Sequence, residues 1–85
     1  MNILIPAPLR SYTKTSRVDA SGATLAAVLV ELDHRFPGIR FRMIDEQDRI
    51  RRHIRVFVDG SQVFDLEHRL HGSEEILIVQ ALSGG

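Results

Sequence analysis

The sequence predicts an α+β domain: a mixed sheet of four to five strands with one main helix, at about residues 24–36, packed on one face. Three observations lead to this fold class. Apolar residues recur at helical spacing within that helix, and alternating apolar residues at 54–58 lead into an Asp59-Gly60 turn. Residues 75–82 then form a last apolar segment. A right-handed crossover from the first strands places the helix on one face of the sheet and leaves the other face uncovered.

Length, charge and cysteine content narrow the range of functions. With 85 residues, the chain forms one small domain that has little room for a deep catalytic cavity. Eleven basic side chains balance eleven acidic ones, whereas nucleic-acid binders usually have a net basic face. The absence of cysteine excludes a disulfide framework, a thiolate metal site and a thiol nucleophile.

Neither the first residues nor the longest apolar run indicates export or membrane insertion. The start, MNILIPAPLR, lacks the basic-then-apolar layout of a secretory signal. The apolar run at residues 25–30 is far too short to span a bilayer. We therefore expect a cytoplasmic protein that binds neither membranes nor nucleic acid.

Two strands joined by a turn are predicted at the N-terminus. Residues 2–9 alternate weakly in polarity and form the first strand, although Pro6 and Pro8 cannot donate a hydrogen bond to a neighbouring strand. Polar residues 11–16 form the turn. Residues 17–20 return as the second strand.

The main helix has clear start and stop signals. Thr24 is a suitable N-cap, because its hydroxyl can accept a hydrogen bond from a free amide of the first turn. Pro37-Gly38 ends the helix, since proline disfavours helical dihedral angles in the residue before it and glycine accepts left-handed ones. The apolar stripe consists of Leu25, Val28, Leu29, Leu32 and Phe36.

The second half of the chain supplies the remaining strands. Residues 39–52 are charged with scattered apolar positions and are interpreted as a short helical turn followed by a loop at the edge of the core. The Asp59-Gly60 pair predicts a tight hairpin turn between strands at 54–58 and 62–64, because both residues tolerate positive φ. The last strand, residues 75–82, is apolar on both faces.

The order of these elements, the chain length and the final Gly84-Gly85 pair resemble the β-grasp, ubiquitin-like proteins. Among them the chain is similar to the bacterial sulfur carriers: the small subunit of molybdopterin synthase, the thiamine sulfur carrier and, most of all, the carrier type of cysteine biosynthesis. The matching stretches cover nearly the whole chain. They are IPAPLRSYT, SGATLAAVLVELDHRFPGIRFRMIDEQDRIRRHIRVFVDG and EEILIVQALSGG.

This resemblance implies a function for the C-terminus. In this family the carboxylate of the last residue, here Gly85, is adenylated with ATP and converted to a thiocarboxylate that donates sulfur in molybdopterin or cysteine-type biosynthesis. Gly84 allows a close approach because it has no Cβ, and Ser83 with Leu82 forms the neck. The predicted organisation is therefore a single β-grasp domain at 1–82 with a flexible tail at 83–85.

The resemblance also implies which partners the chain needs. The chain is a co-substrate and not an enzyme, so it has no catalytic residue and binds no cofactor, and its partner consumes the ATP. The expected partners are an adenylyltransferase of the ubiquitin-activating type, a sulfurtransferase or sulfide as the sulfur donor, and an acceptor synthase.

Three alternatives remain for the Gly-Gly end. The chain is a protein modifier if Gly85 forms an isopeptide bond with a target lysine. It is a binding module with an inert tail if neither sulfur nor lysine receives the acyl group. The pair is also compatible with an ordinary chain end, since termini tolerate many sequences.

Alternation along the strands predicts a docking face. If the even-numbered residues of 54–58 face the helix, Arg55 and Phe57 face outward, and Leu77 and Val79 lie beside them on the last strand. Exposed apolar side chains on adjacent strands suit protein association. The alternative is that the 39–50 segment folds back and covers them.

Other candidate sites have weaker support. His68 and His71 have metal-ligand spacing only on a helix, and no cysteine is available to complete a site, so we expect no metal. No serine has the context of a hydrolase nucleophile. The arginines of the 40–55 region interleave with acidic residues, which predicts a self-neutralised, solvated surface. These arginines are Arg40, Arg42, Arg49, Arg51, Arg52 and Arg55.

Overall fold

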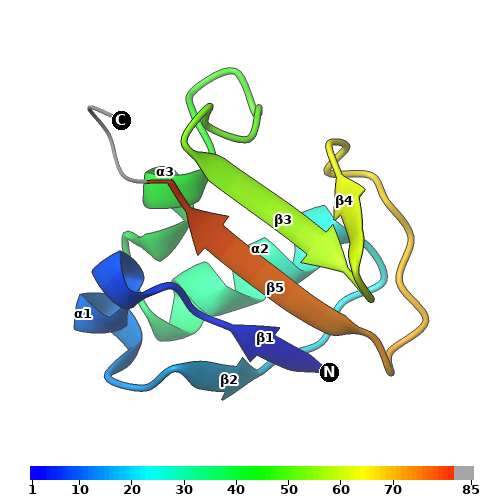
Figure 1. Cartoon of the computed structure of the whole chain (residues 1–85), viewed down its shortest axis with the longest axis horizontal. Coiled ribbons are helices and arrows are strands. Elements are labelled where there is room, and N and C mark those ends of the chain that lie inside the picture. Colours follow the sequence, from blue (N-terminus) through cyan, green and yellow to red (C-terminus); the bar gives the residue numbers. More distant parts are fainter. Residues whose placement is uncertain (82–85) are drawn as a thin grey trace.

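The computed structural model describes residues 1–81, and the tail residues Leu82, Ser83, Gly84 and Gly85 lie outside the described residues. Five strands and four helical segments make up this part of the chain (Figure 1). The strands are β1 (Asn2–Leu4), β2 (Arg17–Asp19), β3 (Ile54–Val58), β4 (Ser61–Val63) and β5 (Glu75–Gln80). The helical segments are the 3₁₀ turn η1 (Ala7–Leu9), α1 (Arg10–Thr13), α2 (Leu25–Arg35) and α3 (Ile39–Met43).

The sheet is mixed, as predicted. Its strand order is β2-β1-β5-β3-β4. The two central strands, β1 and β5, run parallel, and every other neighbouring pair is antiparallel. Figure 1 shows α2 crossing behind the sheet, with β1 and β5 side by side in front of it. The α+β fold class with one main helix on one face is therefore confirmed.

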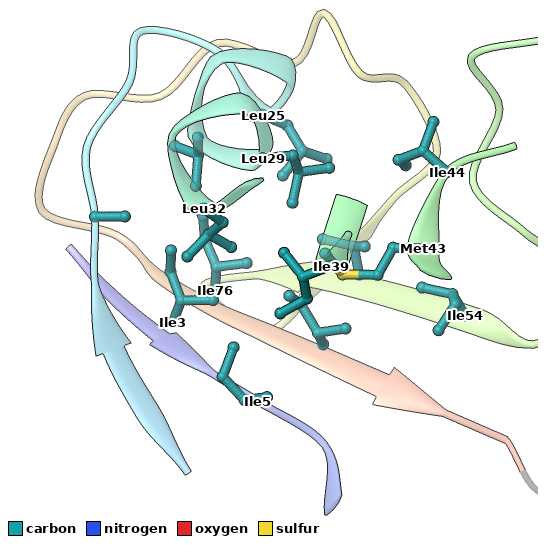
Figure 2. Packing of buried hydrophobic residues seen from close by; sticks show 14 of the residues in the cluster. Ile3, Ile5, Leu25, Leu29, Leu32, Ile39, Met43, Ile44, Ile54 and Ile76 are labelled. Atoms are coloured by element: carbon teal, nitrogen blue, oxygen red, sulfur yellow. The ribbon is translucent and has the colours of Figure 1, made fainter. Parts of the chain in front are cut away.

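The hydrophobic core lies between the sheet and α2. Leu25, Leu29 and Leu32 of the predicted helical stripe are at most 1% exposed, and they pack towards Ile3 and Ile76 of the two central strands (Figure 2). Burial of a side chain of this size contributes about 1.5–3 kcal/mol. Phe36, the last member of the predicted stripe, is only partly buried against the core.

The predicted signals at the ends of α2 are present. The Oγ1 of Thr24 accepts a hydrogen bond from the N–H of Ala27 at 3.2 Å. At the other end, Gly38 adopts a φ of +95°, which favours glycine. The carboxylate of Asp33 accepts hydrogen bonds from the N–H groups of Gly38 and Arg40, both at 3.1 Å, and so joins the end of α2 to the start of α3.

The second predicted strand is confirmed as β2, but the N-terminal prediction was wrong for residues 5–13. β1 ends at Leu4, and residues 7–13 form η1 and α1 in place of the second half of a strand and a turn. Pro6 and Pro8 suit the start of a 3₁₀ turn, where a missing N–H costs nothing. Leu9, which is 2% exposed, joins the core, so tertiary burial stabilises a segment that is too short to form a helix alone.

The long connection between β4 and β5 supports the first turn of α2. The N–H groups of Leu25 and Ala26 donate to the carbonyl groups of His68 and Leu66, at 3.0 and 2.8 Å. These N–H groups have no partner within the helix itself. Gly22 is required beside this turn, because a Cβ at that position would lie 2.7 Å from the backbone nitrogen of Val28.

The hairpin of β3 and β4 is formed by the predicted turn. Asp59 and Gly60 both have positive φ, +49° and +87°. β4 begins and ends one residue earlier than the predicted strand at 62–64, so Phe64 lies after the strand. β5 ends at Gln80, and the predicted strand end at Leu82 falls outside the described residues.

The carboxylate of Glu74 organises the turn before β5. The residue is 7% exposed and accepts hydrogen bonds from the N–H groups of His71 at 2.6 Å and Gly72 at 2.8 Å. The His71 hydrogen bond is the largest cause of a lowered pKa of Glu74, about 2 against an ordinary value of 4.5, and burial opposes the shift. The turn is therefore stabilised by the ionised form of this carboxylate.

We expect Glu74→Gln to destabilise the domain at neutral pH, with an effect that fades in acid. The pKa of this carboxyl is lower in the folded chain than in the unfolded one, so its contribution is present above a pH of about 4.5 and is lost as the pH falls towards about 2. Urea denaturation of wild type and variant at both ends of this range measures the effect. Glu75→Gln, at an exposed neighbour, is the control. A stability difference that is the same at both pH values would contradict the prediction.

None of the helices within residues 1–81 has the length and hydrophobicity needed to cross a membrane.

Candidate functional site

The face of the sheet that points away from α2 carries an apolar centre. One row of paired residues crosses all five strands: Arg17, Leu4, Leu77, Phe57 and Gln62, in the order β2-β1-β5-β3-β4. The three central residues of this row are apolar, and the two ends are polar. The row therefore has the layout of a protein interface, with an apolar core and a polar rim.

We call Leu4, Phe57, Leu77 and Val79 the open-face patch. None of the four belongs to the core or packs against it, whereas their neighbours Ile3, Val56, Ile76 and Ile78 are all buried in the core. Leu77 is 38% exposed, and the other three are half-buried. Because these side chains shield one another only in part, a partner that covered them would remove more apolar surface from water.

The residues of the predicted docking face lie on the expected side of the sheet. Phe57 pairs with Leu77, and Arg55 pairs with Val79 on the adjacent strand. Arg55 is exposed, but its guanidinium Nη1 donates to the backbone carbonyl groups of Arg52 and Ile54, so the side chain turns towards the edge of the sheet.

Sequence reasoning missed Leu4. The signal was the alternation of Ile3 and Ile5, both buried, which places Leu4 on the opposite face. What alternation could not show is that β1 lies beside β5, which brings Leu4 opposite Leu77. The patch therefore extends over three strands and not two.

The 39–50 segment does not fold back over the docking face, which was the alternative to an exposed patch. Ile39, Met43 and Ile44 are each at most 1% exposed and belong to the core. α3 contacts α2, on the helical side of the sheet. The loop that follows closes on itself through a bridge between Ile44 and Ile50.

Two residues of the open-face patch lie on the strand that leads to the C-terminus. Leu77 and Val79 belong to β5, and the chain is held to β3 as far as Ala81, whose N–H donates to the carbonyl of His53 at 2.8 Å. Four residues follow, Leu82 to Gly85, which lie outside the described residues. Four extended residues span at most about 14 Å. The patch therefore shares a strand with the segment from which these four residues continue.

The arginine-rich region is less neutralised than its sequence predicts. Within residues 1–81 its arginines form a single ion pair, Arg40 with Asp48 at 3.2 Å. The carboxylate of Asp45 accepts instead from the backbone N–H groups of Gln47 and Arg49. The hydrogen bond from the Arg49 N–H is the main cause of the lowered pKa of Asp45. This acidic side chain thus orders the loop.

The remaining candidates form no site in the described structure. Within residues 1–81, no three His, Cys, Asp or Glu side chains are grouped so that they could hold a metal ion. His68 and His71 are exposed in the connection between β4 and β5, which is not helical.

The chain was compared with protein families and with solved structures. The ThiS family matches residues 3–85, that is, nearly the whole chain including its Gly-Gly end. No match was found among curated proteins.

Solved structures of similar proteins cover the chain almost completely. The Amycolatopsis orientalis BexX/CysO complex contains a chain of 30% identity with a TM-score of 0.91, and the match covers 99% of this chain and 98% of that one. Mycobacterium tuberculosis CysO, described as an antigen, is 28% identical with a TM-score of 0.89, over 95% of this chain and 98% of that one. The small archaeal modifier protein 1 from Methanosarcina acetivorans is 25% identical with a TM-score of 0.82, over 99% and 94%.

These comparisons agree with the fold. They support a sulfur-carrier or modifier role at the level of the family. From its match over residues 3–85 and its mixed five-stranded sheet, the chain belongs to the ThiS family of β-grasp, ubiquitin-like sulfur carriers and is similar in structure to CysO.

Proposed function

We propose that this protein is a sulfur carrier whose Gly85 carboxylate is adenylated, converted to a thiocarboxylate and used as the sulfur donor of a biosynthetic enzyme. The observation that carries the proposal is the extent of the family match, which continues through Gly85. The open-face patch, which includes Leu77 and Val79 of the last strand β5, supplies a docking surface for the enzymes that must reach Gly85.

The chemistry takes place on the main-chain carboxylate of Gly85. Its oxygen attacks the α-phosphorus of ATP, pyrophosphate leaves, and an acyl-adenylate forms. Sulfide then attacks the acyl carbon, and AMP leaves with the bridging oxygen. The nucleophile is hydrosulfide (HS⁻), which releases its one proton, and the product is a thiocarboxylate. Alternatively, the persulfide of a sulfurtransferase attacks the acyl carbon, and two electrons from a thiol reductant cleave the resulting acyl disulfide to the thiocarboxylate.

The chain supplies the substrate for these steps, and its partners supply the catalysis. An adenylyltransferase of the ubiquitin-activating type binds and consumes the ATP, so this chain needs no cofactor of its own. Glycine at positions 84 and 85 lets the backbone pass through a narrow channel, because no Cβ blocks the approach to the carbonyl carbon. The acceptor is a synthase of the molybdopterin or cysteine type.

A second candidate function is protein modification through Gly85. The similarity to the small archaeal modifier protein 1 favours it. Activation is the same, but a lysine amine of a target takes the acyl group and forms an isopeptide bond. The chain has one lysine, Lys14, which limits conjugation between its own copies to that side chain and the N-terminus.

The test is the intact mass of the protein after incubation with ATP, sulfide and a cognate adenylyltransferase. The product is then trapped with a thiocarboxylate-selective alkylating reagent, since oxidation of methionine adds nearly the same mass as the exchange of oxygen for sulfur. We expect a trapped adduct that maps to Gly85. An adenylate that takes up no sulfur would favour the modifier. The absence of any adduct with an enzyme proved competent on its own carrier would overturn the proposal.

A further inference from the structure

A groove of about 750 Å³ lies at the β4 edge of the sheet. One wall is the 48–52 loop, and the other is the 62–67 segment, which contains the end of β4. β3 runs between the two walls (Figure 1). We call this feature the edge groove. None of the four residues of the open-face patch lines the edge groove.

The edge groove has an apolar floor and an exposed aromatic side chain at its rim. Val56, Val63 and Leu66 on the floor are at most 9% exposed. Phe64 on the rim is 77% exposed, the highest value among the exposed large hydrophobic side chains of residues 1–81. Such exposure leaves apolar surface in water, and a bound apolar side chain would cover part of it.

The charge of the groove is positive. Its lining contains five arginines against three carboxylates, and one of those carboxylates, Asp48, already pairs with Arg40. The Nε of Arg40 is buried and has no hydrogen-bond partner within residues 1–81. The lining arginines are Arg40, Arg49, Arg51, Arg52 and Arg55, and the carboxylates are Asp48, Asp65 and Glu67.

Two arginines of the loop wall are available to a ligand. Arg49 and Arg52 are exposed, and within residues 1–81 neither guanidinium makes a hydrogen bond or an ion pair. Arg51 is engaged differently. Its Nε donates to the carbonyl of Phe41 at 2.8 Å, and its guanidinium stacks on the Phe41 ring at 4.6 Å from the centroid.

The loop wall is held in place by its own hydrogen bonds. The carboxylate of Asp45 accepts from the N–H of Arg49 at 3.0 Å, and the N–H of Arg51 donates to the carbonyl of Met43 at 2.8 Å. The loop therefore presents Arg49 and Arg52 from an ordered backbone, which lowers the entropy cost of binding.

We propose that the edge groove binds an acidic segment of a partner protein, with carboxylates paired to Arg49 and Arg52 and an adjacent apolar side chain packed on Phe64. Charge complementarity selects the acidic ligand, and the exposed ring selects the apolar residue within it. The acidic residues Asp65 and Glu67 line the opposite wall, so the partner's carboxylates face the loop.

The segment binds through its side chains and not as an added strand. At the part of β3 that β4 does not cover, the N–H of Ile54 donates to the carbonyl of Arg51 at 2.9 Å. The carbonyl of Ile54 accepts from Nη1 of Arg55 at 3.2 Å. Both backbone groups of Ile54 are therefore occupied, which disfavours the addition of a strand at this part of β3.

The test uses a fluorescein-labelled peptide in which one leucine is flanked on each side by alternating Asp and Glu residues. Fluorescence polarisation measures its binding to the full-length protein. We expect saturable binding that weakens with salt. We expect the Phe64→Ser variant and the Arg49→Glu/Arg52→Glu double variant each to weaken it by about tenfold or more. Thermal melts check that each variant is folded.

Matched controls separate a groove from general attraction between charges. The double variant Arg17→Glu/Arg69→Glu makes the same change in net charge at exposed arginines that do not line the groove. It should bind the peptide nearly as well as wild type, as should a chain without Gly84 and Gly85. The chain without Gly84 and Gly85 cannot form the proposed thiocarboxylate, so its binding of the peptide tests the groove separately from the sulfur chemistry.

Several outcomes would overturn the proposal. They are the absence of binding at millimolar peptide, equal loss of binding in both double variants, and unchanged binding of Phe64→Ser. Displacement of the peptide by glutamate or inorganic phosphate at low millimolar concentration would identify a site for small anions instead. Backbone amide shifts on adding peptide should concentrate at 49–52 and 62–67. Shifts centred on the open-face patch would place the ligand elsewhere.

Discussion

Deletion of Gly85 is expected to abolish thiocarboxylate formation and leave the fold intact. The deletion removes the glycine whose carboxylate the proposed chemistry uses and leaves the chain one residue shorter. Among residues 1–81 the core cluster ends at Ile78, so the free energy of unfolding should stay within about 0.5 kcal/mol of wild type. Gly85→Ala should reduce thiocarboxylate formation nearly as much, because the Cβ of alanine would clash with the narrow channel of the partner enzyme. Intact mass after trapping and urea denaturation measure the two results.

Ser83→Ala is the control for this prediction. It lies in the same segment, keeps both glycines and changes one hydroxyl group. It should be thiocarboxylated at a rate close to that of wild type. Efficient sulfur uptake by the deletion variant would show that the reaction does not depend on Gly85. A deletion variant that fails to fold would show that the chain end has a structural role.

Substitution Phe57→Asp is expected to weaken the complex with the adenylyltransferase by about 100-fold, which is typical of the loss of an aromatic side chain at the centre of an interface. Phe57 pairs with Leu77 in the middle of the row that crosses the sheet. A carboxylate there would have to lose its hydration among apolar side chains when the partner binds. Isothermal titration calorimetry with the purified enzyme gives the affinity.

Gln62→Asp is the matched control, because it introduces the same charged group in the same row of the sheet, outside the open-face patch. It should change the affinity only slightly. Phe57 is half-buried, so the variant must first be shown to be folded by its thermal melt. Leu77→Asp, at a residue that is 38% exposed, provides a second variant with the same expectation. Wild-type affinity in both variants would exclude the patch as the docking surface.

Local sequence was sufficient where the interactions are local. α2 begins after Thr24 and ends before Pro37 because the cap, the apolar stripe and the breaker all lie within or next to the helix. The Asp59-Gly60 turn follows from the dihedral angles that those two residues accept. For the same reason, alternation along β3 and β5 placed Phe57, Leu77 and Val79 on one face.

Local sequence failed where contacts between distant residues stabilise the structure. Residues 7–13 lack a helical pattern and are helical because Leu9 reaches the core. Glu74 is one acidic residue among many in the sequence, and its role appears only where the turn brings the N–H groups of His71 and Gly72 to its carboxylate.

The candidate site divides in the same way. The Gly-Gly end and its chemistry were predicted from the sequence and its resemblance, and the family match extends over both residues. The third strand of the open-face patch and the edge groove depend on strand order and loop position, which no local pattern specifies.

The sequence by itself therefore determined the fold class, the main helix, the hairpin turn and the residue on which the proposed chemistry depends. Each of these follows from dihedral preferences and apolar periodicity within a few residues, or from the identity of the last ones. Only the tertiary structure decided that Leu4 lies beside Leu77, and that the exposed Phe64 lines a groove together with the arginines of the 48–52 loop. Those neighbours are set by the packing of segments far apart in the chain, where the free energy depends on the whole core and not on any one element.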